Sequence, residues 1–392
     1  MLTVLILILI NISFVGVGLP NSLLGSAWPS MHGEIGVPVS YVGIISMIYL
    51  GGTVVASFFS GKLLARFTAG ICTFMNVSMI GLSLIGFSLS SSFIFLCVFA
   101  LPLGIGTGFT DAVLNSYSAM HFGAKHMNWH HCFWGVGATI GPVFMSYGIA
   151  SSSWRVGYQI TGVVVVAIAV ALLFSLPLWK KFAKLSDTST EEANKPQSFG
   201  SLFRLPGFKT SLAIFFVYVS AEATVGLWGS SYLVMSRGIA PELAAGWLSL
   251  YFLGMTLGRF ISGFVAMLLT GRQIIWLGCV LFGCGIVFLQ IPVGNAAYLI
   301  GFFLMGLGCA PIFPTLVHSS PTRFGARYAQ TAIGVQISSA NIGATVTPPL
   351  FGLLAARVGH GLFPVFLGFL LAVMALMIGM LNKTKVDEET GV

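Results

Sequence analysis

The chain is a succession of long apolar runs separated by short polar intervals. A helix needs about 20 apolar residues to cross a bilayer, and twelve runs reach that length; they cover residues 4–28, 41–64, 70–90, 93–121, 129–150, 156–179, 210–235, 242–268, 273–292, 295–318, 329–356 and 361–381. The runs are continuous, whereas the strands of a membrane barrel alternate apolar and polar residues. The pattern therefore predicts an all-α polytopic membrane protein with 12 transmembrane helices.

The amino-acid composition is typical of an integral membrane protein. Of its residues 56% are hydrophobic and 7% are charged, against about 25% charged in soluble proteins. The net charge of +8 does not indicate nucleic-acid binding, because the basic residues lie in loops between apolar runs. The six cysteines lie in or beside apolar runs without paired spacing, so we expect neither disulfides nor a zinc site.

The basic residues also predict the orientation of the chain. Twelve spans put both termini on one side of the membrane. Fourteen of the 18 lysines and arginines fall on that side, and by the positive-inside rule the termini are cytoplasmic. The first run lacks a basic leader and continues apolar past residue 27, so we interpret it as a span and not as a signal peptide. Short loops and no large external domain fit a bacterial inner membrane.

One long polar interval divides the twelve spans six and six. It covers residues 180–207, which we interpret as a cytoplasmic linker between two six-helix bundles, 1–179 and 208–392. The two halves repeat each other at an offset of 202 residues. The matched pairs are Tyr49 with Tyr251, Gly52 with Gly254, Gly61 with Gly263, Gly104 with Gly306, Gly106 with Gly308, and Ser118 with Ser320. Two homologous six-helix halves are the arrangement of major facilitator transporters.

Few ionisable side chains lie deep inside the predicted spans. Of ten acidic residues only Asp111 and Glu222 do so, and Arg259 is the one such base. A charge inside a bilayer is expensive, so these residues are candidate functional groups. Either acid could carry a proton, and Asp111 with Asn115 could instead hold Na⁺. We expect ion coupling at Asp111 and Glu222. Arg259 is expected to pair with an acid, to bind an anionic cargo group, or to reach for the membrane surface.

Asp111 lies in a polar hairpin, residues 104–142. Gly104, Gly108, Asp111, Asn115 and Ser118 share one helix face, which should point to protein or water.

Amides and indoles on otherwise apolar helices are candidate groups for a polar cargo. Amides both donate and accept hydrogen bonds, as sugar hydroxyls do, although such groups also join helices to each other. The expected substrate-binding residues are Glu222, Asn115, Gln336, Trp228, Asn341, Asn21 and Trp134, with His131 and Arg259 as network partners. Trp134 and Trp228 could stack on a sugar ring. The histidines at 121, 126, 130 and 131 and Cys132 match no standard zinc spacing, so no metal site is predicted.

Several motifs resemble those of the major facilitator superfamily. The loop after the second span reads Gly61-Lys62-Leu63-Leu64-Ala65-Arg66-Phe67-Thr68-Ala69-Gly70; it keeps the Gly and Arg of the family pattern but has Ala65 at its Asp. A finer set resembles the fucose permease and related sugar porters: Gly104-x-Gly106-x-Gly108-x-x-Asp111-x-x-x-Asn115, Asn128-x-x-His131-x-x-x-Gly135, Glu222 with Gly226 and Trp228, and Gly258-Arg259-x-x-x-Gly263. Proton symporters of that type also carry an acid in the first helix. The first span of this chain has no acid, and Asn21 is the polar residue that could take its place.

The resemblance implies a secondary transporter that works by alternating access as a monomer. The expected cargo is a sugar or related polyol, carried by symport with H⁺ or Na⁺, and no other cofactor is expected. One alternative is an exporter of amphipathic compounds on the same fold, and a second is a sugar receptor that no longer transports. Arg259 keeps an organic-anion carrier open as a third. No catalytic constellation or nucleotide fingerprint points to an enzyme.

Overall fold

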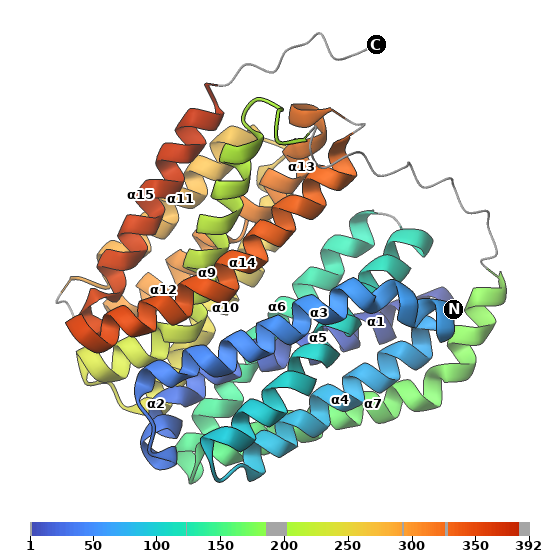
Figure 1. Cartoon of the computed structure of the whole chain (residues 1–392), viewed down its shortest axis with the longest axis horizontal. Helices are drawn as coiled ribbons and strands as arrows, with labels where there is room; N and C mark the ends of the chain where they lie inside the picture. The colour runs from blue at the N-terminus through green and yellow to red at the C-terminus, as the bar shows by residue number, and fades with distance from the viewer. Residues whose placement is uncertain (1, 123, 186–201, 292–293, 326–327, 384–392) are drawn as a thin grey trace. The chain divides into compact units, whose positions relative to one another are not determined.

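The structure is a computed structural model, and it describes residues 2–122, 124–185, 202–291, 294–325 and 328–383. Every regular element in these ranges is helical (Figure 1). The first half of the chain contains α1 (Leu2–Asn21), α2 (Leu23–Ile35), η1 (Val39–Tyr41), α3 (Val42–Arg66), α4 (Ala69–Leu89), α5 (Phe93–His121), α6 (Ala124–Ser151) and α7 (Trp154–Leu185). The second half contains α9 (Phe208–Arg237), α10 (Pro241–Val265), α11 (Gly271–Phe288), α12 (Asn295–Cys309), α13 (Ile312–Phe324), α14 (Ala329–Val358), η3 (His360–Leu362) and α15 (Phe363–Leu381).

The chain divides into two compact units. Unit 1 comprises Met1–Ser189, Leu227–Phe252 and Gly352–His360, and unit 2 comprises Thr190–Gly226, Leu253–Phe351 and Gly361–Val392. In unit 1, α4 packs against α5 and α7, α3 against α5, and α1 against α6 (Figure 1). In unit 2, α11 packs against α12, α13 and α15. The predicted boundaries at 179 and 208 stay a prediction, and most of the predicted linker, residues 186–201, lies outside the described residues.

The predicted membrane architecture is confirmed. Eleven helical stretches of the described chain are long and apolar enough to cross a membrane, and they coincide with eleven of the twelve predicted spans. The remaining prediction, residues 329–356, forms α14, which is not among the eleven. Its polar side chains explain this; within it lie Gln336, Ser338, Ser339, Asn341, Thr345 and Thr347. A long helix that is this polar belongs against other protein or a water-filled cavity.

Two of the predicted spans are each built from two helices. The first span breaks at Ser22, between α1 and α2, two residues after Pro20. The tenth breaks at Ala310 and Pro311, between α12 and α13. Proline has no backbone N–H and its ring clashes with the preceding turn, so it interrupts the helical hydrogen bonds. A break within a span leaves backbone carbonyls without helical donors, and in transporters such breaks occur beside the cargo site.

The internal repeat reappears as matching contacts between helices. A Cβ added to Gly52 would meet the backbone at Leu101 O and Ile105 N, and one added to Gly254 would meet Phe303 O and Leu307 N. These two contact sets differ by the same 202 residues as the glycines themselves. Gly106 and Gly308 repeat the pattern, with Asn76 O and Ile80 matched by Gly278 O and Phe282. Glycine is required at these positions because the neighbouring backbones are too close for a side chain.

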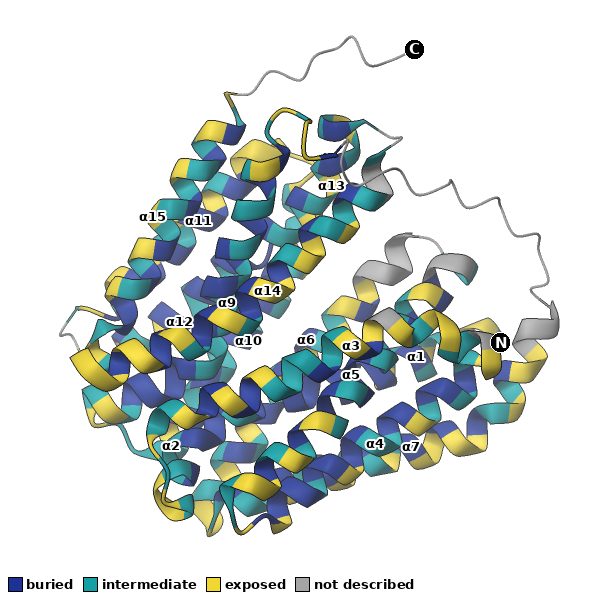
Figure 2. Cartoon of the chain, in the orientation of Figure 1, coloured by how far each residue is buried: buried dark blue, intermediate teal, exposed yellow. Residues whose placement is uncertain are grey.

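Exposed apolar side chains cover the helices of both units. Leu82 on α4, Phe174 on α7 and Leu376 on α15 are 63%, 78% and 66% exposed, and Figure 2 shows such exposed positions (yellow) along all three helices. In water each of these side chains would cost about 1.5–3 kcal/mol relative to burial. In hydrocarbon they cost nothing, so these faces are lipid-facing surfaces.

An ion pair joins three helices at one end of unit 1. Arg155, at the start of α7, binds the Glu34 carboxylate of α2 and donates a second hydrogen bond to Ser90 O after α4, at 3.1 Å. The indole N–H of Trp154 donates to the other oxygen of Glu34 at 2.5 Å. The guanidinium also lies 4.3 Å from the Trp154 ring centroid. Both charges are partly exposed, so the pair positions the helix ends more than it stabilises the fold.

Candidate functional site

Asp111 and Asn115 form a hydrogen-bonded pair on α5. The side-chain amide of Asn115 donates to Asp111 Oδ1 over 3.1 Å, one helical turn away. The other amide atom, Asn115 Oδ1, is buried and has no hydrogen-bond partner among the described residues. A buried acceptor without a donor costs about 1–3 kcal/mol. A bound proton donor or cation would remove that cost, so this pair is suited to a ligand.

Tyr49 on α3 belongs to the same site, and sequence reasoning missed it. Its hydroxyl lies beside Thr107 and in the electrostatic field of Asp111. The close approach of α3 and α5 at their glycines brings these groups together. Tyr49 was visible in the sequence only as a marker of the internal repeat. Its position one helix away from Asp111 follows from packing.

Unit 2 contains a second polar cluster, around Tyr218 on α9. The Tyr218 hydroxyl donates to Cys309 O, the last carbonyl of α12, at 2.9 Å. Glu222, one turn further along α9, and Arg259 of α10 both act electrostatically on this hydroxyl. The sequence offered Asp111 and Glu222 as acids near Arg259. In the structure, Glu222 and Arg259 both act on the Tyr218 hydroxyl. Tyr218 is the second residue that the sequence did not single out.

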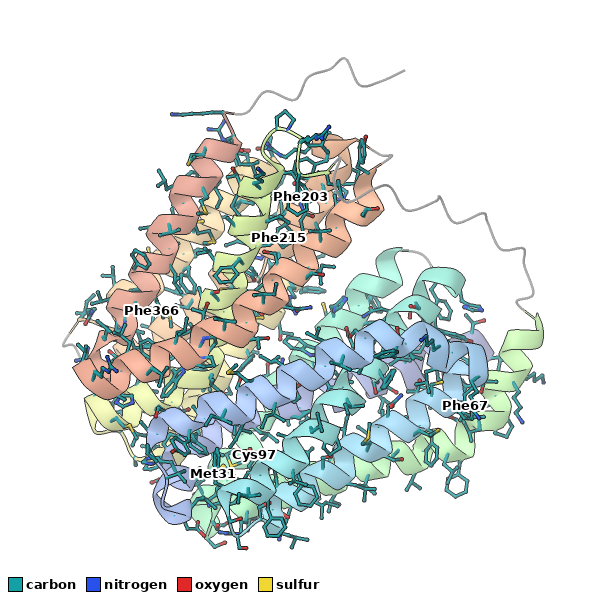
Figure 3. All side chains as sticks on the ribbon, in the orientation of Figure 1. Met31, Phe67, Cys97, Phe203, Phe215 and Phe366 are labelled. Atoms are coloured by element: carbon teal, nitrogen blue, oxygen red, sulfur yellow. The ribbon has the colours of Figure 1, made fainter. Side chains whose placement is uncertain are left out.

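Aromatic packing holds α9 against the start of α13 beside this cluster. The rings of Phe215, labelled in Figure 3, and Phe313 meet edge to face, with centroids 5.4 Å apart. Tyr218 also lies against Phe313, at 6.2 Å. These contacts fix α9 relative to the broken helix, so the position of the Tyr218 hydroxyl is defined by rigid neighbours.

Gln336 on α14 is bound on both sides by other helices. Its amide donates to Ser211 Oγ of α9 at 2.8 Å and its carbonyl oxygen accepts from Ser320 Oγ of α13, also at 2.8 Å. The side chain is fully buried. In this conformation neither amide atom is open to a cargo, and the geometry favours the joining of helices, which is the alternative that the sequence left open.

The substitution Gln336→Met is expected to lower the thermal midpoint of the detergent-solubilised protein. The KM for transport should change little. The substitution keeps the volume but removes the hydrogen bonds to Ser211 and Ser320, at a cost of about 1–3 kcal/mol, although Ser320 still donates to Leu316 O. Ser338→Ala, on the exposed face of the same helix, is the matched control and should leave the midpoint unchanged. A KM raised tenfold at an unchanged midpoint would restore Gln336 to the cargo site.

The remaining predicted residues differ in how accessible they are. Trp228 is fully buried, packed against Gly352 and 5.9 Å from the His360 ring, so stacking of its ring on a cargo stays a prediction. Asn21, His131 and Asn341 are exposed within apolar helices, and Trp134 is half-buried. Unit 1 contains Asn21, Asp111, Asn115, His131, Trp134 and Trp228, and unit 2 contains Glu222, Arg259, Gln336 and Asn341.

The histidines of α6 join helices. His130 Nδ1 lies 2.6 Å from Asn11 Oδ1 of α1, and its ring stacks on Phe14 at 5.4 Å. The side chains of His126 and Asn128 are outside the described set. Among the described residues no three His, Cys, Asp or Glu side chains are close enough to hold a metal ion.

Comparison with known families decides the class of protein. Residues 10–248, more than half of the chain, match the family described as the Major Facilitator Superfamily. This chain belongs to the major facilitator superfamily. Its fold agrees, because it matches the crystal structure of a mutant of the nucleoside transporter NupG with a TM-score of 0.75 at 13% identity, over 95% of this chain and 98% of that one.

Three individual proteins resemble the chain at low identity. The "Bypass of stop codon protein 6" of Saccharomyces cerevisiae is 24% identical, over 93% of this chain and 80% of that protein. The cis,cis-muconate transport protein of Acinetobacter baylyi is also 24% identical, over 93% and 90%. The glucose/mannose transporter GlcP of Bacillus subtilis is 22% identical, over 71% and 69%.

The family sets the general function. The protein is an integral membrane transporter of small molecules and not an enzyme. Three of the similar proteins are named for cargos of different chemistry, which are muconate, glucose or mannose, and nucleosides. The cargo of this chain therefore has to be argued from its own residues.

Proposed function

We propose that this protein carries a sugar or related polyol across the membrane by alternating access, coupled to H⁺ or Na⁺. The observation that carries the proposal is the buried, unpartnered Oδ1 of Asn115, next to a carboxylate. A sugar hydroxyl donates to such an oxygen and accepts from a neighbouring amide. The likeness to a glucose/mannose transporter supports this cargo class.

Two acids inside membrane spans support ion coupling. Asp111 lies in α5 and Glu222 in α9, both well inside membrane spans. A carboxylate in this environment is costly unless it is used. Uptake or release of a proton at Asp111 would change the charge beside Asn115, and Na⁺ would find two oxygens there. We assign the coupling role to Asp111, with His131 and Arg259 as supporting residues.

The likeness to a muconate transporter raises an organic anion as the alternative cargo. Arg259 is the group that would bind its carboxylate. Glu222 and Arg259 both act electrostatically on Tyr218, so an acid lies in the neighbourhood that such an anion would enter, which argues against it. A neutral polar cargo fits unit 2 better.

We further propose that the protein is a monomer of the fucose permease-like group, in a bacterial inner membrane, with both termini cytoplasmic. The motifs around Asp111 and Arg259 and the distribution of lysine and arginine support these assignments.

Counterflow in proteoliposomes tests the function. Vesicles preloaded with unlabelled glucose, mannose, galactose or fucose are given the labelled sugar, with and without pH and Na⁺ gradients. Saturable exchange of at least one sugar, enhanced by one of the two gradients, is expected. Empty vesicles are the control. Exchange of no sugar under any gradient would contradict the proposal, and binding without exchange would indicate a receptor.

A further inference from the structure

Asp111 determines which end of the Asn115 amide faces it. An ionised carboxylate can only accept hydrogen bonds, whereas a primary amide has one donor end and one acceptor end. Asn115 therefore turns Nδ2 towards Asp111, and this nitrogen lies 3.1 Å from Asp111 Oδ1. The acceptor end, Asn115 Oδ1, is left buried with no hydrogen-bond partner among the described residues. The pair as it stands lacks one donor.

Tyr49 is the ionisable side chain that faces this pair from a neighbouring helix. The helices α3, α4, α1 and α6 pack against α5, and Tyr49 of α3 lies in the electrostatic field of Asp111. The helix α1 contains no ionisable side chain, and within the described residues no cation pairs with Asp111. Other ionisable side chains on these helices lie against different groups: Lys62 against Phe59, Arg66 against Phe67, Cys72 against Leu63 O and Phe67 O, His121 against Tyr117, and His130 and His131 against Phe14.

Two kinds of donor can satisfy Asn115 Oδ1. The first is a proton bound to Asp111, because a protonated carboxyl has an O–H group. The terminal torsions of Asp and Asn are soft, so an acid and an amide one helical turn apart can form two reciprocal hydrogen bonds. In these the amide N–H donates to the carboxyl C=O and the carboxyl O–H donates to Asn115 Oδ1. The second donor is a hydroxyl of the cargo, which can bind Asn115 Oδ1 or the carboxylate beside it.

The two donors oppose each other. A hydrogen bond to an ionised carboxylate is roughly twice as strong as one between neutral groups, so a cargo hydroxyl is held most tightly while Asp111 is ionised. A proton on Asp111 removes that charge and also engages Asn115 Oδ1. Each donor therefore weakens the binding of the other, and by linkage the loss of affinity is equal in both directions.

We infer that the cargo and the coupling proton compete for the Asp111–Asn115 pair, so that binding of the sugar releases a proton and the protein exchanges sugar for H⁺. The inference rests on the proposed function, because it sets the sign of coupling for the same sugar. The Asp111 carboxyl gives its proton to water on the side from which the sugar enters. It takes up a proton on the opposite side after the sugar has left. This differs from the symport that the resemblance to the fucose permease implies, in which sugar and proton travel together.

Proton release on sugar binding is the first measurement. Purified protein in weakly buffered detergent solution with a pH indicator receives glucose, mannose, galactose or fucose, whichever exchanges fastest in counterflow. Wild type is expected to release up to about one proton per protein. The dissociation constant of that sugar should rise about tenfold for each pH unit on the acidic side of the titration. In Asp111→Asn no proton should be released, and the dissociation constant should not depend on pH.

The direction of accumulation gives a second readout. Wild-type proteoliposomes are expected to accumulate the labelled sugar when the lumen is more acidic than the medium, and the reversed pH gradient should drive no uptake. Symport would give the opposite pattern. The sign does not depend on how the protein is oriented in the vesicles, because it follows from the stoichiometry of the exchange.

Two further variants separate the proton site from damage. Asp111→Glu restores a carboxyl and should release a proton when the sugar binds. Glu34→Gln removes a carboxylate that is paired with Arg155 at one end of unit 1, and its proton release should match that of wild type. Size-exclusion profiles in detergent show whether each variant is folded.

The outcomes distinguish this inference from the function on which it rests. Sugar exchange by wild type, with proton uptake or no change in pH on sugar binding, would overturn the inference and leave the function standing. Proton release by folded Asp111→Asn, or sugar binding without release by Asp111→Glu, would also overturn it. Accumulation driven by a Na⁺ gradient at a pH-independent affinity would do the same. No binding and no exchange of any sugar by wild type would overturn both.

Discussion

Replacing Asp111 with asparagine is expected to abolish gradient-driven accumulation and to leave sugar exchange intact. Asparagine has nearly the shape of aspartate, and its side-chain oxygen still accepts the hydrogen bond from Asn115. It can neither release a proton nor balance a cation. Exchange needs no net movement of the coupling ion, so it continues.

The size of this effect follows from the driving force. One charge moving down 100 mV releases about 2.3 kcal/mol, which sustains roughly 50-fold accumulation of cargo. Without coupling the accumulation ratio falls to about one. The measurement is uptake of the best sugar into proteoliposomes under pH and Na⁺ gradients, with counterflow assayed in the same preparations.

Glu34→Gln is the matched control for the loss of a carboxylate. Glu34 is bound to Arg155 and Trp154 at one end of unit 1, and its neutralisation should leave accumulation within twofold of wild type. Full accumulation by Asp111→Asn would remove Asp111 from the coupling role. Loss of both exchange and accumulation in a folded variant would place it in cargo binding instead.

The helices and their repeat could be predicted because both are encoded locally. The thickness of the hydrocarbon core sets the number of apolar residues that a spanning helix needs. Eleven helical stretches of the described chain have this length and apolar character. Residues repeated at an offset of 202 also make matching contacts, as Gly52 and Gly254 do. What the pattern did not predict was the interruption of two spans at Ser22 and Pro311. Apolar content continues across a break, so hydropathy alone does not detect it.

The candidate site could be predicted only in part, because hydrogen-bond partners come from other helices. An intramembrane charge is visible in sequence, so Asp111, Glu222 and Arg259 could be singled out as candidates. Tyr49 and Tyr218 look like ordinary interfacial or packing aromatics until their hydroxyl partners are known. Gln336 has an amide that could bind a cargo, yet both of its amide atoms are hydrogen-bonded to serines of other helices. The residue type shows that a side chain can form hydrogen bonds, but the packing of the helices determines which group is its partner.

The substitution Gly104→Ala is expected to destabilise the protein severely. A Cβ at this position would overlap the backbone carbonyl of Tyr49, so α3 and α5 would have to move apart. Because backbone cannot rotate away as a side chain does, we expect a loss of about 3 kcal/mol. For a chain of 392 residues that is equivalent to a fall of roughly 4 °C in the thermal midpoint. The shift would also separate Tyr49 from Asp111, so coupling should weaken in any folded fraction. The measurement is thermal unfolding in detergent, with exchange and accumulation assayed on the surviving protein.

Gly51→Ala separates this packing effect from the change of residue type. Gly51 lies on α3, and no atom lies within 4 Å of a Cβ added there. Alanine is favoured over glycine inside a helix by about 1 kcal/mol, so this variant should be as stable as wild type or more so. An equal loss of stability in both variants would show that helix flexibility, and not the approach of α3 to α5, requires the glycines. A stable Gly104→Ala would mean that the two helices are further apart in the membrane. The placement of Tyr49 beside Asp111 would then have to be abandoned, because the same close approach produces both.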